Sequence, residues 1–390
     1  MQQDIKPKIV DDIKKNVLFS DRKNVIYSIG SIQKDRYITA DANSVDYIMD
    51  VFSQFNGKQT VEEISNKFIR DYNKQIDVHK LLDIAIAGGL IINADKKSTC
   101  FNEFEKYGVK LFEMNIAKLE KLINFISNKI GKIVLIILLM EVFCSIFLLP
   151  GFSKHLAVFN LYNVMNSSIL SIILSTVITS TSVIMHEFSH AIIGIKNGLV
   201  PKKITFSIYM FTPIIYINIP GIYTLKKSNR ILIHGVGILT NIGILCIGII
   251  GSYFFTGTLS EIFMLIAFNN LGLIVMNIIP FMPIDGYFIL MNLLKIPNLR
   301  KLSINKIRLI LDTKDNVYKI IYLVYNIISV LFVIFMVFTI ITQISSNFMK
   351  GFSDNRNIIN GLYRIRGYLL ILLLMISSKI ILWLRKDKQK

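Results

Sequence analysis

Apolar and polar positions follow two different patterns along this chain of 390 residues. Beyond about residue 130, long apolar runs alternate with short polar connections, and a run of about 20 apolar residues can cross a bilayer as a helix. The pattern predicts six membrane-spanning helices, near residues 131–149, 166–194, 231–255, 261–280, 317–345 and 367–384. Because the number of crossings is even, both ends of this membrane domain would lie on the same side of the membrane.

The first 95 residues predict a small α+β domain instead. Residues 24–40 alternate in two short runs around a polar turn, which is typical of a β-hairpin. Helical spacing of apolar residues follows three times, and a short strand comes last. This order predicts a winged-helix arrangement. The expected N-caps of the three helices are Asn43 or Ser44, Thr60, and Asp77.

Residues 96–130 join the two parts. Their apolar residues recur at helical spacing opposite lysines, which predicts an amphipathic helix on the membrane surface. Packing on the N-terminal domain is the alternative. The apolar stripe comprises Phe112, Ile116, Leu119, Ile123 and Ile126. We therefore expect four parts: a cytosolic domain at 1–95, a linker helix at 96–130, a membrane domain at 131–384 and a basic tail at 385–390.

Composition and charge agree with a membrane protein. Hydrophobic residues make up 53% of the chain, and the mean hydropathy is +0.53. The formal net charge of +18 does not indicate nucleic-acid binding, because lysines and arginines gather in alternate connections between the spans. The positive-inside rule then places these connections and both termini in the cytoplasm, with residues 346–366 as an exception. The three cysteines are scattered, so no disulfide framework or thiolate metal site is expected.

The chemistry of the chain centres on the sequence HEFSH within the second span. His186 and His190 lie four residues apart, so a helix brings both imidazoles to one face, where they can bind one ion. Glu187 between them can activate water in a zinc hydrolase. A buried polar pair that only links helices is the alternative.

A third ligand is predicted at the end of the fourth span. Asp285 is the only acidic residue between Glu261 and Asp312. Pro280 and Pro283 would break the helix just before it, so that the carboxylate could turn toward the histidines. Two imidazoles and one carboxylate leave a fourth tetrahedral position open, as in catalytic zinc sites.

With HExxH on one span and NxxPxxxxDG on another, the chain resembles the site-2 protease family of intramembrane zinc metallopeptidases, over residues 166–295. The resemblance implies that His186, His190 and Asp285 bind one Zn²⁺ ion and that Glu187 is the general base. It also implies that residues 204–219 form a membrane-associated β-hairpin whose edge pairs with an extended substrate.

Three further polar residues are candidates for support of the site or of the transition state. His234 could assist a tetrahedral intermediate, although we favour an interfacial histidine held by polar neighbours, since no spacing ties it to the motif. Asn241 belongs to a Gly/Asn segment similar to one in the family, which here lacks a proline often found there. Asn277 lies within the second motif. Amides in membrane bundles also commonly hold helices together.

The N-terminal domain resembles the PQQ-biosynthesis protein D-like domain, in its hairpin, the sequence NGKQTVEEI and the later GGLI. This family includes elements that bind leader peptides of ribosomally made, modified peptides, as a strand beside the hairpin and against the third helix. DNA binding is disfavoured, because the third helix carries Asp77 and Asp83. A regulatory or dimerisation domain is the alternative.

Together these patterns predict a membrane-embedded zinc metalloendopeptidase that removes the leader of a modified peptide near the cytoplasmic face, with a peptide exporter as a further partner. One alternative is regulated intramembrane proteolysis of a membrane-anchored regulator. A second is an immunity or transport-partner protein with a structural metal site. Substitution of Glu187 by glutamine would separate the enzymes from the last alternative, since a structural site tolerates it.

Overall fold

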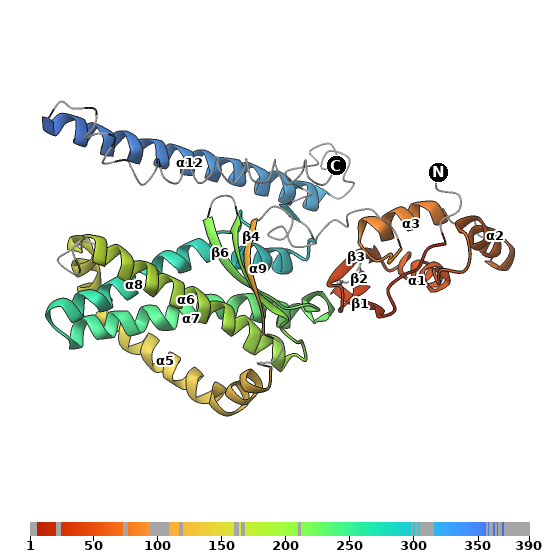
Figure 1. Ribbon diagram of the computed structural model, residues 1–390, viewed down its shortest axis with the longest axis horizontal. Coiled ribbons are helices and arrows are strands. Elements are labelled where there is room, and N and C mark those ends of the chain that lie inside the picture. Colours follow the sequence, from red (N-terminus) through yellow and green to blue (C-terminus); the bar gives the residue numbers. More distant parts are fainter. Residues whose placement is uncertain are drawn as a thin grey trace.

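A computed structural model of the chain describes residues 6–20, 25–72, 77–93, 109–116, 120–159, 168–209, 212–297 and 316–355, with a few isolated positions besides. A small α+β domain, residues 6–93, lies at one end of the long axis, and we call it the head (Figure 1). Long helices fill the other end. The molecule is therefore mostly helical, with two small sheets.

The head contains a three-stranded antiparallel sheet in the order β1-β2-β3. Its three helices cover one face of this sheet, where Ile29 and Ile38 pack with the apolar sides of the helices. The predicted hairpin and all three helices are present. The elements are β1 (Ile13–Ser20), β2 (Val25–Ser31), β3 (Arg36–Asp41), α1 (Val45–Gln54), α2 (Val61–Tyr72) and α3 (Val78–Ala87).

The predicted helix caps are only partly as expected. Thr60 and Glu63 form the reciprocal capping box, with hydrogen bonds of 2.8 and 3.3 Å. Asp77 accepts a hydrogen bond from the Lys80 amide. Ser44 is the N-cap of α1, but its hydroxyl bonds to Asp41 rather than to the helix. Strand β1 escaped sequence analysis because its lysines hide the alternation of apolar residues.

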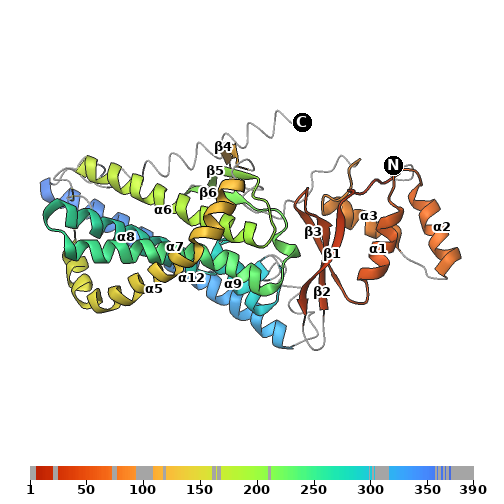
Figure 2. The ribbon, with the colours of Figure 1, turned by 90° about the horizontal axis from the view of Figure 1, so that it is seen from below.

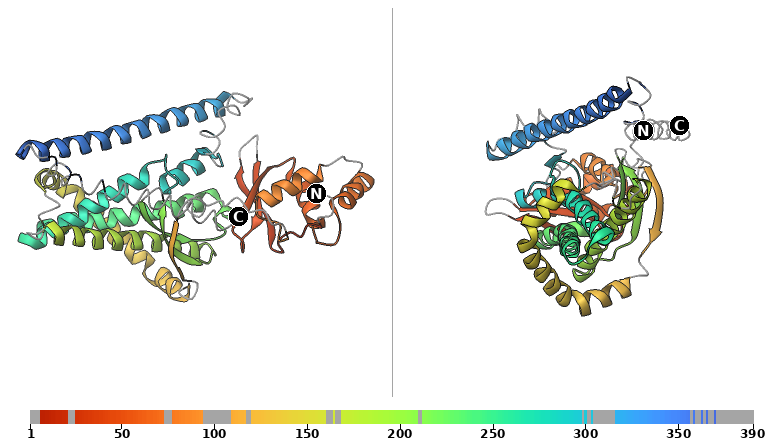
Figure 3. Two further views of the ribbon diagram at one scale, coloured as in Figure 1. Left: turned by 45° about the horizontal axis from the view of Figure 1, so that its top comes forward. Right: turned by 90° about the vertical axis from the view of Figure 1, so that its left-hand side faces the viewer.

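Five described helices are long and apolar enough to cross a membrane. They coincide with the first five predicted spans, whereas the sixth, at 367–384, and the basic tail at 385–390 lie outside the described residues. The helices are α5 (Glu120–Val158), α6 (Ser168–Lys196), α7 (Lys227–Phe254), α8 (Gly257–Ile278) and α12 (Asn316–Asn355). Helix α12 runs beside the others rather than among them (Figure 3).

Helices α7 and α8 approach closely enough that a side chain would not fit between them. A Cβ atom on Gly248 would lie 2.7 Å from the backbone nitrogen of Ala267. Such close approach at small residues is typical of helices packed in membranes. Because α8 packs so closely against it, α7 is a rigid support for the residues that contact its other faces.

A second antiparallel sheet, in the order β4-β5-β6, lies against the helices (Figure 1). Strands β5 (Lys203–Tyr209) and β6 (Thr212–Asn218) form the predicted hairpin. Strand β4 (Val109–Asn115) corrects our prediction of a linker helix over this stretch. The helical stripe misled because Leu111, Phe112 and Met114, although apolar, are exposed beside β5 rather than packed on one helical face.

The head packs against the rest of the chain through the sheet face that its own helices leave free. Figure 2 shows β1–β3 between the helices of the head and those of the membrane domain. Side chains on that face, such as Ser28 and Tyr37, are buried. The main contact element is the short helix η2 (Ile222–Thr224), which links β6 to α7. Tyr37 of β3 packs against Tyr223, with ring centroids 5.6 Å apart.

Candidate metal centre

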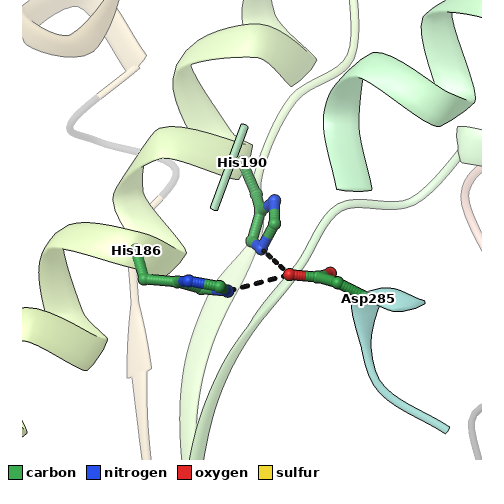
Figure 4. Close-up of side chains that lie close together, drawn as sticks. All are labelled: His186, His190 and Asp285. Carbon is green, nitrogen blue, oxygen red and sulfur yellow. Dashed lines mark ion pairs between the residues drawn. The ribbon is translucent and has the colours of Figure 1, made fainter. Parts of the chain in front are cut away.

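His186 and His190 lie on one face of α6, as their spacing predicts. Their ring centroids are 4.8 Å apart, and the rings are nearly perpendicular. Both residues are buried, at 5% and 8% exposure. Figure 4 shows the two imidazoles turned toward the carboxylate of Asp285. The helix thus presents two nitrogen donors to one point.

Asp285 begins α9 (Asp285–Leu294), directly after the irregular segment that contains Pro280 and Pro283. A carboxylate in the first turn of a helix is favoured by the helix dipole. Gly286 makes this turn possible, because a Cβ atom there would lie 2.4 Å from the carbonyl oxygen of Ile278. The aspartate-glycine pair therefore brings the carboxylate back against the end of α8.

The three side chains have the arrangement of metal ligands. Asp285 Oδ2 lies 2.9 Å from His186 Nε2 and 3.4 Å from His190 Nε2. Neighbouring ligand atoms in a tetrahedral zinc site lie about 3.3 Å apart, given bonds of about 2.0 Å. Asp285 Oδ2 is buried and accepts no hydrogen bond of good geometry from either ring. The donors therefore fit a divalent ion such as Zn²⁺.

Helix α7 holds the second polar atom of each of these ligands. His190 Nδ1 lies 2.6 Å from the carbonyl oxygen of Ile233. His234 Nδ1 lies 3.5 Å from Asp285 Oδ1, the oxygen that points away from the other two histidines. Contacts of this kind fix the orientation of metal-binding side chains and the tautomer of metal-binding imidazoles. Both histidine Nε2 atoms are thereby free to bind a metal.

The third contact from α7 joins the amide of Asn241 to His186 Nδ1 at 3.1 Å. Asn241 is fully buried, and its Oδ1 has no partner when Nδ2 faces the ring. Turning the amide by 180° places Oδ1 against the ring, where it accepts the Nδ1 proton and leaves Nε2 of His186 without a proton. Asn241 is therefore a structural support of His186.

Gly237 lies where α7 passes the two imidazoles. A Cβ atom at this position would lie 2.5 Å from the His186 ring and 2.7 Å from the His190 ring. Gly235, two residues earlier, has no such neighbour within 4 Å. Of these two glycines in the predicted Gly/Asn segment, only Gly237 makes room for the ligands.

Glu187 contacts the second sheet. Its Oε2 accepts a hydrogen bond of 2.9 Å from the amide of Ile217 in β6. The last strand of the sheet is thus tied directly to the candidate general base.

Of the remaining candidates, His234 lies at the site, whereas Asn277 bonds within its own helix. His234 joins the site, contrary to our preference for a merely interfacial histidine, and its ring stacks on Phe288 at 4.8 Å. Its spacing from HEFSH carried no signal, because the two segments meet only through packing. Asn277 instead donates to Leu273 on its own helix, 3.0 Å away. Sequence analysis missed the role of Phe288 and of the Ile233 carbonyl, for which no motif exists.

Comparison with known proteins adds no assignment. No family model, no curated protein and no solved structure matches this chain. The functional argument therefore rests on the geometry of these side chains.

Proposed function

We propose that the chain is a membrane-embedded zinc metalloendopeptidase. The observation that carries the proposal is the convergence of His186, His190 and Asp285 on one point, with the donor set of catalytic rather than structural zinc sites. Glu187 is the neighbouring carboxylate, and its bond to β6 holds it beside the same point. The resemblance of both sequence motifs to the site-2 protease family supports the same activity.

The chain's own groups would divide the work of peptide hydrolysis. A bound Zn²⁺ ion would act as a Lewis acid toward a water molecule and the peptide carbonyl. Glu187 would accept a proton from the attacking water and return it to the leaving amine as the carbon–nitrogen bond breaks. An extended peptide beside β6 would be held by backbone hydrogen bonds, with its scissile carbonyl near the ligands.

We propose further that the substrate is a precursor peptide whose leader is bound by the head. The leader would add as a strand at β3 rather than β1, because two carbonyls near the end of β1 already accept hydrogen bonds from the membrane domain. These are Leu18 O, bonded to Arg230, and Ser20 O, bonded to Lys295. The basic connections between the spans favour a location in the cell membrane, with the head on the cytoplasmic side.

The test is cleavage of small peptides encoded near this gene by the full chain in detergent. Glu187→Gln should keep metal but lose roughly 100-fold or more in turnover, as expected for removal of a general base. Glu261→Gln is a matched control, because Glu261 is exposed on α8. A leader peptide added in trans should raise KM without lowering kcat.

Two outcomes would count against the proposal. Equal cleavage by wild type and Glu187→Gln would exclude the proposed role of Glu187. Cleavage that responds to Glu187 but not to added leader would leave a protease with another substrate class, such as a membrane-anchored regulator.

A further inference from the structure

Arg230 is a fully buried cation in the first turn of α7. Its guanidinium donates three hydrogen bonds to three separate segments: Nε to Asn292 Oδ1 on α9 at 2.7 Å, Nη1 to the Leu225 carbonyl at 2.7 Å, and Nη2 to the Leu18 carbonyl on β1 at 2.6 Å. It also lies over the ring of Phe19, 4.9 Å from the centroid. One side chain thus joins the head to two helices of the membrane domain.

These four partners of Arg230 are all neutral. A buried charge is costly unless its hydrogen bonds are made, and the planar guanidinium is suited to several fixed acceptors at once. From sequence, this arginine belonged to a basic cytoplasmic connection, where it would be exposed. Its burial therefore depends on the docked head, which supplies Leu18 O and Phe19.

Arg230 is also connected to the metal centre. Asn292, its partner on α9, donates to the carbonyl of Phe288 at 2.8 Å. The Phe288 ring stacks on His234, which contacts Asp285 Oδ1. Along α7 itself, His234 lies one turn after Arg230. Both routes lead to the side chains that orient the metal ligands.

Other contacts fix the head around the same point. Ser28 Oγ donates to the carbonyl of Tyr223 at 3.0 Å, and the amide of Gly221 donates to Asp35 Oδ1 at 3.3 Å. Gly221 has a φ of +97°, a conformation that favours glycine. The segment that contacts the head therefore lies between β6, whose Ile217 amide bonds to Glu187, and α7, whose residues contact the metal ligands.

We propose that Arg230 is a positioning residue of the metal centre, and that the docked head is part of the scaffold that holds the ligands in place. This inference rests on the proposed function only in requiring that the three ligands bind a metal ion. When the head undocks, Arg230 loses Leu18 O and Phe19. The first turn of α7 and the last turn of α9 are then less constrained, and the ligands bind metal less tightly.

The experiment uses the full chain in detergent and measures Zn²⁺ affinity by competition with a chelating dye, together with the absorption spectrum of the Co²⁺-substituted protein. Arg230→Met should weaken Zn²⁺ binding roughly tenfold or more and alter the Co²⁺ spectrum, as loss of outer contacts does at metal sites. Arg230→Lys should recover part of the affinity. Lys227→Met is the matched control, because Lys227 contacts the Leu293 carbonyl on α9.

A second variant guards against loss of folding. Phe19→Ala changes only the head, and it should shift affinity and spectrum in the same direction as Arg230→Met, by a smaller factor. Wild-type affinity and spectrum in both variants would overturn the inference, as would equal losses in Arg230→Met and Lys227→Met. If Arg230→Met does not fold, Phe19→Ala decides alone. Failure of the proposed function is distinguishable, because it would appear in wild type itself, as absence of cleavage or of bound metal, whereas failure of this inference appears only in the comparison of the variants with wild type.

Discussion

At the scale of residues, the site is defined as much by the contacts behind the ligands as by the ligands. His186, His190 and Asp285 each use one atom toward the common point and a second toward α7. A motif can specify the first atom, because it depends on spacing along a helix. The second depends on packing, to which the small residue Gly237 contributes as well as the polar groups.

Gly237→Ala tests this directly. The added Cβ would overlap both imidazoles, so we expect metal affinity to fall at least roughly tenfold. The helix itself should not suffer, since alanine is favoured over glycine in helices by about 0.5–1 kcal/mol. The measurement is Zn²⁺ affinity alongside thermal unfolding of the metal-free protein.

Gly235→Ala is the control for Gly237→Ala, because its Cβ would meet no atom within 4 Å. It gives the same gain in helix propensity without the overlap. If both alanine variants bound Zn²⁺ as wild type does, the placement of Gly237 against the ligands would be wrong.

The convergence of the three candidate donors was predictable from sequence, and part of their surroundings was not. HEFSH and the proline-flanked Asp285 identified the three donors because both signals are local: helical spacing in one case, a helix break in the other. His234 lies 44 residues beyond His190 and meets Asp285 only through the packing of α7 on α9. Side chains joined in this way leave no pattern in a single sequence.

At the scale of elements, strand β6 connects the second sheet to the candidate general base, Glu187. The amide of Ile217 points to Glu187, so it cannot also take part in the ladder with β5. The hairpin was expected from the resemblance of residues 204–219 to a segment of the site-2 protease family. Strand β4 was not, because it pairs with β5 across nearly 90 residues of chain, and helical and strand periodicities are hard to separate in so short a stretch.

Ile217→Pro tests the role of β6, since proline lacks the amide hydrogen that Glu187 accepts. A hydrogen bond to a charged group contributes about 1.5–3 kcal/mol, so we expect kcat to fall roughly tenfold or more with Zn²⁺ affinity retained. Ile215→Pro removes the amide two residues earlier, on the same edge of the strand, without touching Glu187. Comparable kcat values in the two variants would show that the contact does not matter for turnover.

At the scale of the whole molecule, the head is attached to one end of the membrane domain. Its sheet is contacted on both faces, by its own helices on one side and by η2 and the end of α9 on the other (Figure 2). The change from a small α+β part to long apolar helices was predictable from hydropathy, whereas the predicted boundary at residue 95 lies next to residues outside the described ranges. The docking was not predictable, because many of its contacts use backbone groups, and the others use residues such as Arg230, which looked like a loop charge.

This arrangement changes how deletion of the head should be interpreted. A chain without residues 1–95 would lose any leader-binding surface, but it would also lose two partners of Arg230. Lost activity would then report on the metal centre as well as on substrate capture. Point variants and competition by a free leader separate the two effects.

The central claim is that three buried side chains hold one catalytic metal ion, and elemental analysis of the purified chain tests it most directly. The account predicts about one zinc per chain in wild type and in Glu187→Gln, and far less in His190→Ala. A wild-type protein without zinc or another divalent transition metal would contradict it, as would undiminished zinc in His190→Ala.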